Sequence, residues 1–158
     1  MTSRRLLIAM STMVALLMVA GAISFVRYTR SHAPDPRLVA VAPFDIFVPG
    51  LEPWRVRLAV GLSNAIRAPL AAVPQDVVRE RWHAQARPEI AALDLARRTS
   101  ATRAIYGRLD PMVATRDSVR VQMIVIDAGT GRVQLLFDRS WPIADLGNLA
   151  RVLAACVR

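Results

Sequence analysis

The hydrophobic pattern of this chain is dominated by one stretch near its beginning. The range Leu6–Val26, LLIAMSTMVALLMVAGAISFV, contains no charged residue. At about 1.5 Å of rise per residue, a helix of this length reaches roughly 30 Å, the thickness of the hydrocarbon core of a bilayer. Arg5 precedes the stretch, and Arg27 and Tyr28 follow it, as basic and aromatic residues flank membrane helices. The pattern predicts one N-terminal transmembrane helix, within an anchor of residues 1–30.

The same stretch also fits a cleavable secretory signal, with Ala20-Gly21-Ala22 as its small-residue cleavage site. However, the apolar run continues to Val26 and exceeds the roughly 7–15 apolar residues of a signal core. An uncleaved anchor is therefore the favoured interpretation. The arginines on the two sides are nearly balanced, so the positive-inside rule alone does not fix the orientation.

Beyond the anchor, the spacing of apolar residues alternates between that of strands and that of helices. Short β-branched runs and two-residue alternation predict strands, and repeats every three or four residues predict helices. The predicted elements are a strand at Leu38–Phe44, a loop at Asp45–Pro53, a helix at Pro53–Arg67, a short strand at Leu70–Val73, helices at Gln75–Gln85 and Pro88–Arg98, strands at Arg103–Leu109, Val119–Asp127 and Arg132–Asp138, and a helix at Asp145–Val157. The order β-α-β-α-α-β-β-β-α predicts an α+β fold, a mixed β-sheet packed with helices. A Pro-containing linker at 31–37 joins the anchor to this domain, residues 38–158.

The same spacing predicts the surroundings of particular residues. Gly61 is expected to let its helix pack closely on the first strand. Ile90 is expected on the buried stripe of its helix, and Cys156 is expected to be a small core residue. The glycines of Ala128–Gly131 predict a hairpin turn with positive φ. Asp145 is expected to cap the last helix.

Charge and cysteine content narrow the function classes. The formal net charge is +9, and every basic residue apart from the two histidines is arginine, as in proteins of GC-rich genomes. The charge is therefore a weak indication of nucleic-acid binding, and no nucleic-acid partner is predicted. Arginines beside the anchor suit anionic lipid headgroups. Cys156 has no cysteine partner, and His32 and His83 lack a metal-ligand spacing, so no metal site is predicted.

Motifs with catalytic spacing are not evident. Gly129-Thr130-Gly131 lacks the lysine of a phosphate-binding loop. Ser63 as a nucleophile with His83 as its base is the least favoured alternative, because Ser63 falls within a predicted helix. Carboxylates at predicted strand ends are expected to cap turns, namely Asp45, Asp110 and Asp127. We therefore predict no enzyme and no cofactor.

The predicted loop at Asp45–Pro53 is unusually apolar. Phe47, Val48 and Leu51, with the adjoining Trp54, are candidates for a protein interface. The alternative is that this loop covers the core of its own domain. Trp82 and Trp141 are expected to be partly buried.

Four blocks of the sequence resemble the TolB amino-terminal-like domain of bacterial envelopes, whose pattern includes "VAVLPF", "GL", "A…GA.Y…G" and "d..tG.v". The matching residues are Val39, Pro43 and Phe44, then Gly61 and Leu62, then Ala104, Tyr106 and Gly107, and finally Asp127, Thr130, Gly131 and Val133. The resemblance spans about residues 38–150, and it departs at Thr102, where the family usually has glycine. Relatives act in the periplasm as parts of envelope assemblies or as domains behind a transmembrane helix. The resemblance thus implies a bacterial inner-membrane protein with a cytoplasmic N-terminus and a periplasmic domain.

Together these observations predict a non-catalytic single-pass membrane protein. Its domain would be an accessory or structural subunit that docks on a larger inner-membrane assembly, such as an energy-converting or transport complex. The alternative is a periplasmic small-ligand-binding or sensor domain, which requires a concave pocket with convergent polar groups.

Overall fold

The computed structural model describes residues 34–113 and 115–157. The transmembrane helix predicted at Leu6–Val26, with its flanking Arg5, Arg27 and Tyr28, lies outside these residues. Within them, no helix combines the length and the apolar character that crossing a membrane requires.

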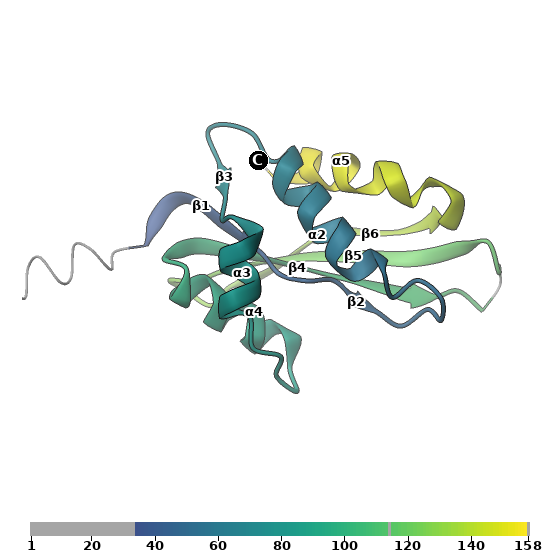
Figure 1. The fold of residues 1–158 in the computed structure, drawn as a ribbon, viewed down its shortest axis with the longest axis horizontal. Helices are drawn as coiled ribbons and strands as arrows, with labels where there is room; N and C mark the ends of the chain where they lie inside the picture. Colours follow the sequence, from purple (N-terminus) through teal and green to yellow (C-terminus); the bar gives the residue numbers. More distant parts are fainter. Residues whose placement is uncertain (1–33, 114, 158) are drawn as a thin grey trace, which may run out of the picture. The chain divides into compact units, whose positions relative to one another are not determined.

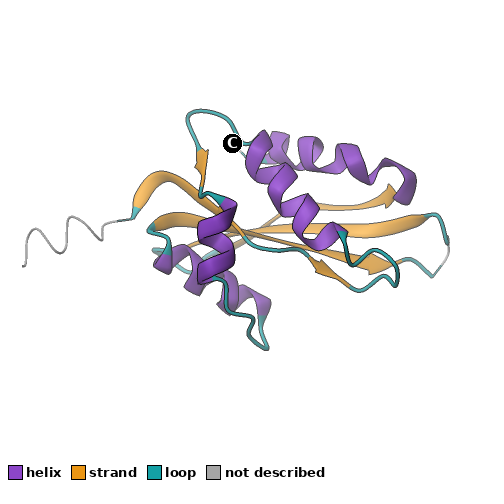
Figure 2. Ribbon diagram, viewed as in Figure 1, coloured by secondary structure: helices purple, strands orange, loops and turns teal. Residues whose placement is uncertain are grey.

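The described residues form the predicted α+β fold, a mixed sheet with helices packed on it (Figures 1 and 2). In chain order the elements are β1 (Asp35–Val41), β2 (Asp45–Ile46), α2 (Trp54–Ala65), β3 (Ala71–Ala72), α3 (Gln75–Arg81), α4 (Pro88–Arg98), β4 (Ala101–Pro111), β5 (Ser118–Asp127), β6 (Val133–Pro142), the 3-10 helix η1 (Ile143–Asp145) and α5 (Leu146–Cys156). The predicted order is confirmed except for β2, which lies in the predicted loop. A strand of two residues is too short to leave a periodic signal in the sequence.

The first strand begins earlier than predicted, inside the predicted linker. Asp35 pairs with Ala101 of β4, and its backbone N–H donates to the carbonyl of Ser100 at 2.8 Å. Pro36 is tolerated there because proline is compatible with the start of a strand. A register shift between Asp35 and Val39 then brings the apolar part of β1 into the core.

Strand β4 is the centre of the sheet. The strand order is β3-β1-β4-β5-β6, and β2 also pairs with β4. The strands β1 and β2 run parallel to β4, whereas β5 pairs antiparallel with β4, and β6 pairs antiparallel with β5. Strand β1 therefore starts at the same end of the sheet as β4, and β2 lies beside the other end of β4.

The two faces of the sheet carry separate cores, because successive strand residues point to opposite faces. Ile105 and Leu109 of β4 face the core under α2 and α5, whereas Ala104 and Tyr106 face the core under α3 and α4. Figure 1 shows α2 and α5 lying together and α3 and α4 lying nearer the end where β1 begins. Consequently the far end of the second face, where β4, β5 and β6 carry polar residues, is not covered by α3 or α4.

Three of the predicted side-chain environments are wrong. A Cβ at Gly61 would lie 2.9 Å from the Cβ of Ala150, so the glycine lets α2 approach α5 rather than the first strand. Ile90 is 47% exposed, because α4 buries the stripe Ala91, Ala92, Leu95 and Ala96 instead. Cys156, the last residue of α5, is exposed.

The two predicted turn roles are partly confirmed. Gly131 has φ +69° in the β5–β6 hairpin, as predicted, whereas Gly129 does not need positive φ. Asp145 stands at the N-cap of α5, but its Oδ1 accepts a hydrogen bond from Nδ2 of Asn148 at 2.5 Å rather than from a backbone N–H.

Candidate functional site

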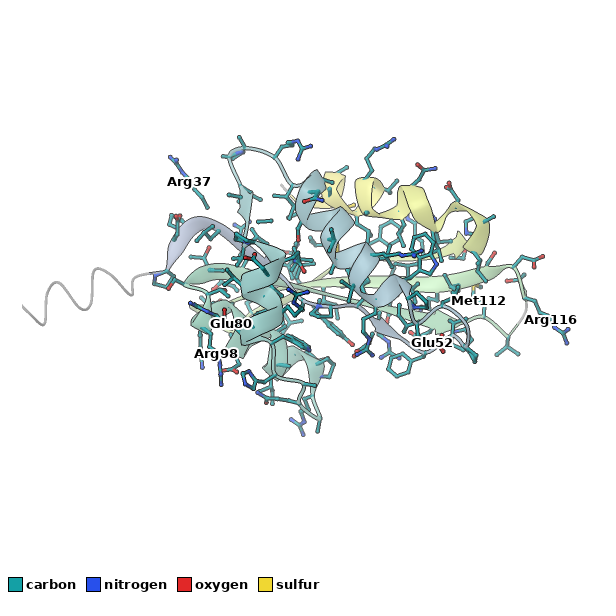
Figure 3. The ribbon with its side chains drawn as sticks, viewed as in Figure 1. Arg37, Glu52, Glu80, Arg98, Met112 and Arg116 are labelled. Carbon is teal, nitrogen blue, oxygen red and sulfur yellow. The ribbon has the colours of Figure 1, made fainter. Side chains whose placement is uncertain are left out.

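The predicted interface residues lie in one ordered segment, which we call the β2–α2 loop surface, defined by Phe47, Val48, Leu51 and Trp54. The N–H of Phe47 donates to the carbonyl of Leu109 at 2.9 Å, which extends the pairing of β2 with β4. The N–H of Leu51 donates to Val48 and that of Trp54 donates to Leu51, at 3.2 and 2.9 Å. Gly50 makes the turn between them with φ +84°. Figure 3 places Glu52 and Arg116 toward this end of the domain and Arg37 toward the other.

The side chains of this surface divide into two groups. Val48, Leu51 and Trp54 are half-buried against the core under α2 and α5, so the predicted alternative, that the loop covers its own domain, holds for them. Phe47 is 55% exposed. The Arg108 guanidinium lies 5.0 Å from the Phe47 ring centroid, within cation–π range, and holds the exposed ring in place.

Beneath the loop, a polar pair ties β2 to β4. The Tyr106 hydroxyl donates to Oδ2 of Asp45 at 2.9 Å, and Arg55 lies 3.4 Å from the other carboxylate oxygen. Burial, together with the hydrogen bond to the Asp45 carboxylate, raises the pKa of Tyr106 well above its usual range. Asp45 is therefore not the turn cap that its place in the sequence predicted. It anchors the strand from which Phe47 projects.

The Tyr106 contact makes alkaline stability testable. The folded state keeps the phenol protonated at pH values where the unfolded chain ionises it, so stability falls as the pH rises above about 10. Tyr106→Phe is expected to cost about 1 kcal/mol at neutral pH and to weaken this alkaline loss. Thermal unfolding of the full chain in neutral detergent at pH 8 and pH 11 measures both. Tyr28→Phe, at the other of the chain's two tyrosines, is the control and should unfold as the wild type does. An unchanged dependence of stability on alkaline pH in Tyr106→Phe contradicts the assignment.

A row of paired charges crosses the uncovered part of the sheet next to Phe47. Arg108 Nη2 donates to Oδ1 of Asp110 at 2.6 Å, so Asp110 pairs within β4 and does not cap a turn as predicted. Arg120 donates to both carboxylate oxygens of Asp138 across β5 and β6, at 2.8 and 2.7 Å. Arg120, together with Gln122, lowers the pKa of Asp138 to about 2.

The sequence did not lead us to predict this row of ion pairs, although it contains part of the pattern that produces the row. The two-residue alternation in β5 put Arg120 and Gln122 on one face, but nothing in it named Asp138 of the next strand as their partner. The row is electrically balanced, and removing it from water would be costly. Phe47, at the border of this row, is an exposed aromatic side chain.

The remaining candidates fall in structural positions. The Oδ1 of Asp127 accepts hydrogen bonds from the backbone N–H groups of Gly129 and Thr130 at 3.0 and 2.8 Å, which confirms its turn-capping role. Trp82 and Trp141 are partly buried, as predicted, and Trp141 Nε1 donates to the carbonyl of Asp145 at 3.0 Å.

Ser63 and His83 are not brought together as a nucleophile and a base. The Ser63 hydroxyl donates to the Ala59 carbonyl at 2.9 Å and accepts from Nε2 of Gln75 at 2.7 Å. His83 instead lies beside the Arg81 carbonyl, and in the described part of the chain no hydrogen bond joins it to Ser63. Within residues 34–113 and 115–157, no group of three or more His, Cys, Asp or Glu could hold a metal ion.

Comparison with known proteins reveals a shared fold. No family model matches the chain, and no curated protein matches it. The lipoprotein GNA1162 from Neisseria meningitidis has a similar structure, with a TM-score of 0.50 and 17% identity over 77% of this chain and 96% of that one. This chain is less similar to two further structures. A PelC dodecamer from Paraburkholderia phytofirmans has a TM-score of 0.45 and 18% identity, over 80% of this chain and 87% of that one. The LpoB C-terminal domain from Salmonella enterica has a TM-score of 0.44 and 11% identity, over 75% of this chain and 90% of that one.

Proposed function

We propose that this chain is a non-catalytic accessory protein of the bacterial inner membrane. Residues 1–30 anchor it with the N-terminus in the cytoplasm, and the α+β domain stands in the periplasm. The domain docks on a larger inner-membrane assembly through the β2–α2 loop surface.

The observation that carries this proposal is the state of Phe47. The Phe47 ring is 55% exposed. Its backbone N–H is hydrogen-bonded to β4, and the Arg108 guanidinium lies 5.0 Å from the ring centroid, so the ring is restrained before any partner binds. A pre-ordered aromatic side chain loses little conformational entropy on docking, and this is typical of residues that dominate interfaces. Trp54 and Leu51 of the same loop are half-buried against the core under α2 and α5, which leaves the Phe47 ring as the exposed aromatic group of this surface.

Kinship with the TolB amino-terminal-like domain is part of the proposal. It is supported by Phe44 and Gly107, which belong to separate blocks of the family pattern and are packed against each other, Phe44 from the segment between β1 and β2 and Gly107 from β4. Thr102, where the chain departs from the pattern, has its hydroxyl donating to the carbonyl of Asp35 at 3.1 Å. In the turn between α4 and β4, the residue with a positive φ is Ser100, at 55°, rather than Thr102.

The test is purification of the full chain from native membranes in mild detergent, followed by quantification of the proteins recovered with it. Phe47→Ala and Trp54→Ala are each expected to reduce the recovered partner at least about tenfold, because an interface hot spot contributes 2 kcal/mol or more. Ile90→Ala is the matched control, since Ile90 is an apolar side chain of similar exposure, 47%, on α4. Undiminished recovery with Phe47→Ala, in a domain that still folds, contradicts the proposal.

A further inference from the structure

A hollow of about 470 Å³ lies at the opposite end of the sheet from the β2–α2 loop surface. Its polar lining includes Arg103, Asp127, Arg132 and Gln134, and its apolar wall includes Val39. The volume falls within the range of small-ligand sites. This is the concave pocket with convergent polar groups that the small-ligand alternative required.

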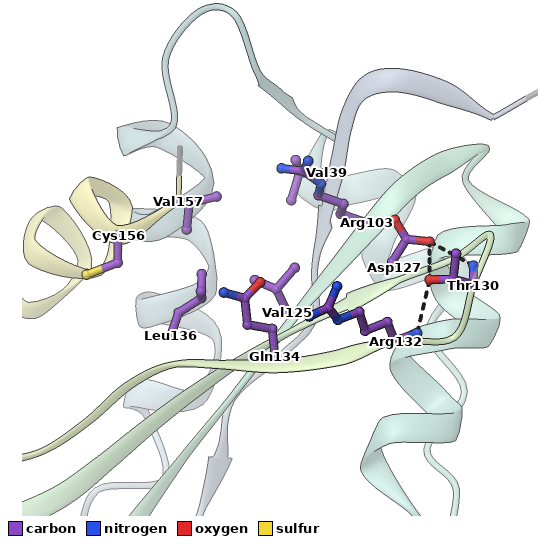
Figure 4. A pocket seen from close by; sticks show the side chains of 10 residues that line it. All are labelled: Val39, Arg103, Val125, Asp127, Thr130, Arg132, Gln134, Leu136, Cys156 and Val157. Atoms are coloured by element: carbon purple, nitrogen blue, oxygen red, sulfur yellow. Dashed lines mark hydrogen bonds between the residues drawn. The ribbon is translucent and has the colours of Figure 1, made fainter.

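The sheet register places the two arginines on either side of one carboxylate. Arg103 of β4 is opposite Asp127 of β5, and the Asp127 N–H donates to the carbonyl of Arg132 at 2.9 Å. Figure 4 shows the Arg103 side chain extending toward Val39 and that of Arg132 extending from the hairpin turn toward Val125. Both guanidinium groups therefore reach into the hollow from its hairpin side.

The carboxylate between them is occupied by its own turn. The Oδ1 of Asp127 accepts from the Gly129 N–H and from both the N–H and the hydroxyl of Thr130, at 3.0, 2.8 and 2.9 Å. Among the described residues, no ion pair within 4.0 Å engages Arg103 or Arg132. Two cations against one engaged anion leave the hollow with a net positive charge.

We propose that this hollow binds a phosphate-bearing anion. Arg103 and Arg132 would donate to its oxygens, because a planar guanidinium matches the geometry of phosphate. The amide of Gln134, in the next row of the sheet opposite Val125, adds a neutral donor. The apolar wall suits the carbon atoms attached to a phosphodiester.

The position of the hollow indicates the source of that anion. It lies at the end of the sheet where β1 begins, and Asp35 follows the apolar stretch ending at Val26 by nine positions. On the proposed function, which anchors this domain to a membrane, the occupant is the headgroup of an anionic phospholipid. This choice of source rests on the membrane anchor of the proposed function, whereas the anion site itself does not.

The test titrates the full chain, in neutral detergent micelles, with glycerophosphoglycerol, glycerophosphocholine and inorganic phosphate. Amide NMR shifts of residues 128–136 report binding. The double variant Arg103→Gln/Arg132→Gln is expected to bind glycerophosphoglycerol at least about tenfold more weakly, a difference of 1.4 kcal/mol. The variant Arg79→Gln/Arg116→Gln removes the same charge from exposed positions elsewhere and should bind as the wild type does. Gln134→Glu, an exposed change that spares both arginines, should also weaken binding.

The possible outcomes test the anion site and the source of the anion separately. Tighter binding of glycerophosphoglycerol than of inorganic phosphate supports a lipid headgroup. Binding of inorganic phosphate with equal or greater affinity supports the site and overturns the lipid source. Binding that is unaffected by the Arg103 and Arg132 changes, or no binding by the wild type, overturns the site, and neither result bears on docking through Phe47.

Discussion

Gly107→Ala is expected to destabilise the domain by at least about 3 kcal/mol, because a Cβ at this position would overlap the Phe44 ring. Gly107 lies in β4, the central strand, and both it and Phe44 are buried. The Phe44 ring occupies the space that a side chain at 107 would fill, so one of them must move. Movement of β4 would disturb its pairing with β1 and β5, and movement of the ring would open the core under α2 and α5.

Chemical unfolding of the full chain in detergent measures the effect, and a double-mutant cycle identifies its cause. Phe44→Ala by itself is expected to cost about 3–5 kcal/mol, but Gly107→Ala should cost little more in that background, because the ring is gone. Gly129→Ala, at an exposed turn glycine without positive φ, is the control and should change stability by less than about 0.5 kcal/mol. Equal costs of Gly107→Ala with and without Phe44 would show that the contact is not responsible.

Gly61→Leu is expected to cost about 2–3 kcal/mol through the packing of α2 on α5. The Cβ that it adds would lie 2.9 Å from the Cβ of Ala150, closer than two carbon atoms can approach. Leu is a better helix former than Gly, so the intrinsic helix preference works in the opposite direction. Any loss of stability therefore reports the contact between the two helices.

The matched control is Gly147→Leu, the same substitution at a helical glycine with nothing within 4 Å of the added Cβ. It should leave stability unchanged or raise it slightly. Ala150→Gly in the Gly61→Leu chain should recover part of the loss by removing the opposing methyl group. Equal melting temperatures for Gly61→Leu and the wild type would contradict close packing of α2 on α5.

The elements that the sequence predicted correctly are those with a strong periodic signal. Leu38–Phe44 and Val119–Asp127 are β-branched or alternating runs, and each contains most of an observed strand. The failures occur where neighbours outside the local sequence decide the outcome. Strand β2 exists because β4 pairs with it, and Ile90 and Cys156 are exposed because the partner helix or sheet covers only part of the apolar side of each helix.

The same division holds for the candidate surfaces. Phe47 was singled out by an apolar run between turn residues and is exposed, whereas Trp54 next to the same run is half-buried in its own domain. The ion pair of Arg120 with Asp138 was not predictable, because it joins residues 18 positions apart on adjacent strands. The hollow behind Arg103 and Arg132 was missed for the same reason, since only the register of β4, β5 and β6 brings these two arginines together.

The central claim is that the end of the domain marked by Phe47 contacts another membrane protein. Its most direct test places a photo-crosslinking amino acid at position 47 of the full chain in native membranes, and the same amino acid at position 90 as the control. We expect one discrete protein adduct from position 47 and none from position 90, where the exposed fraction is comparable. The same adduct from both positions, or none from position 47, would contradict docking through this surface.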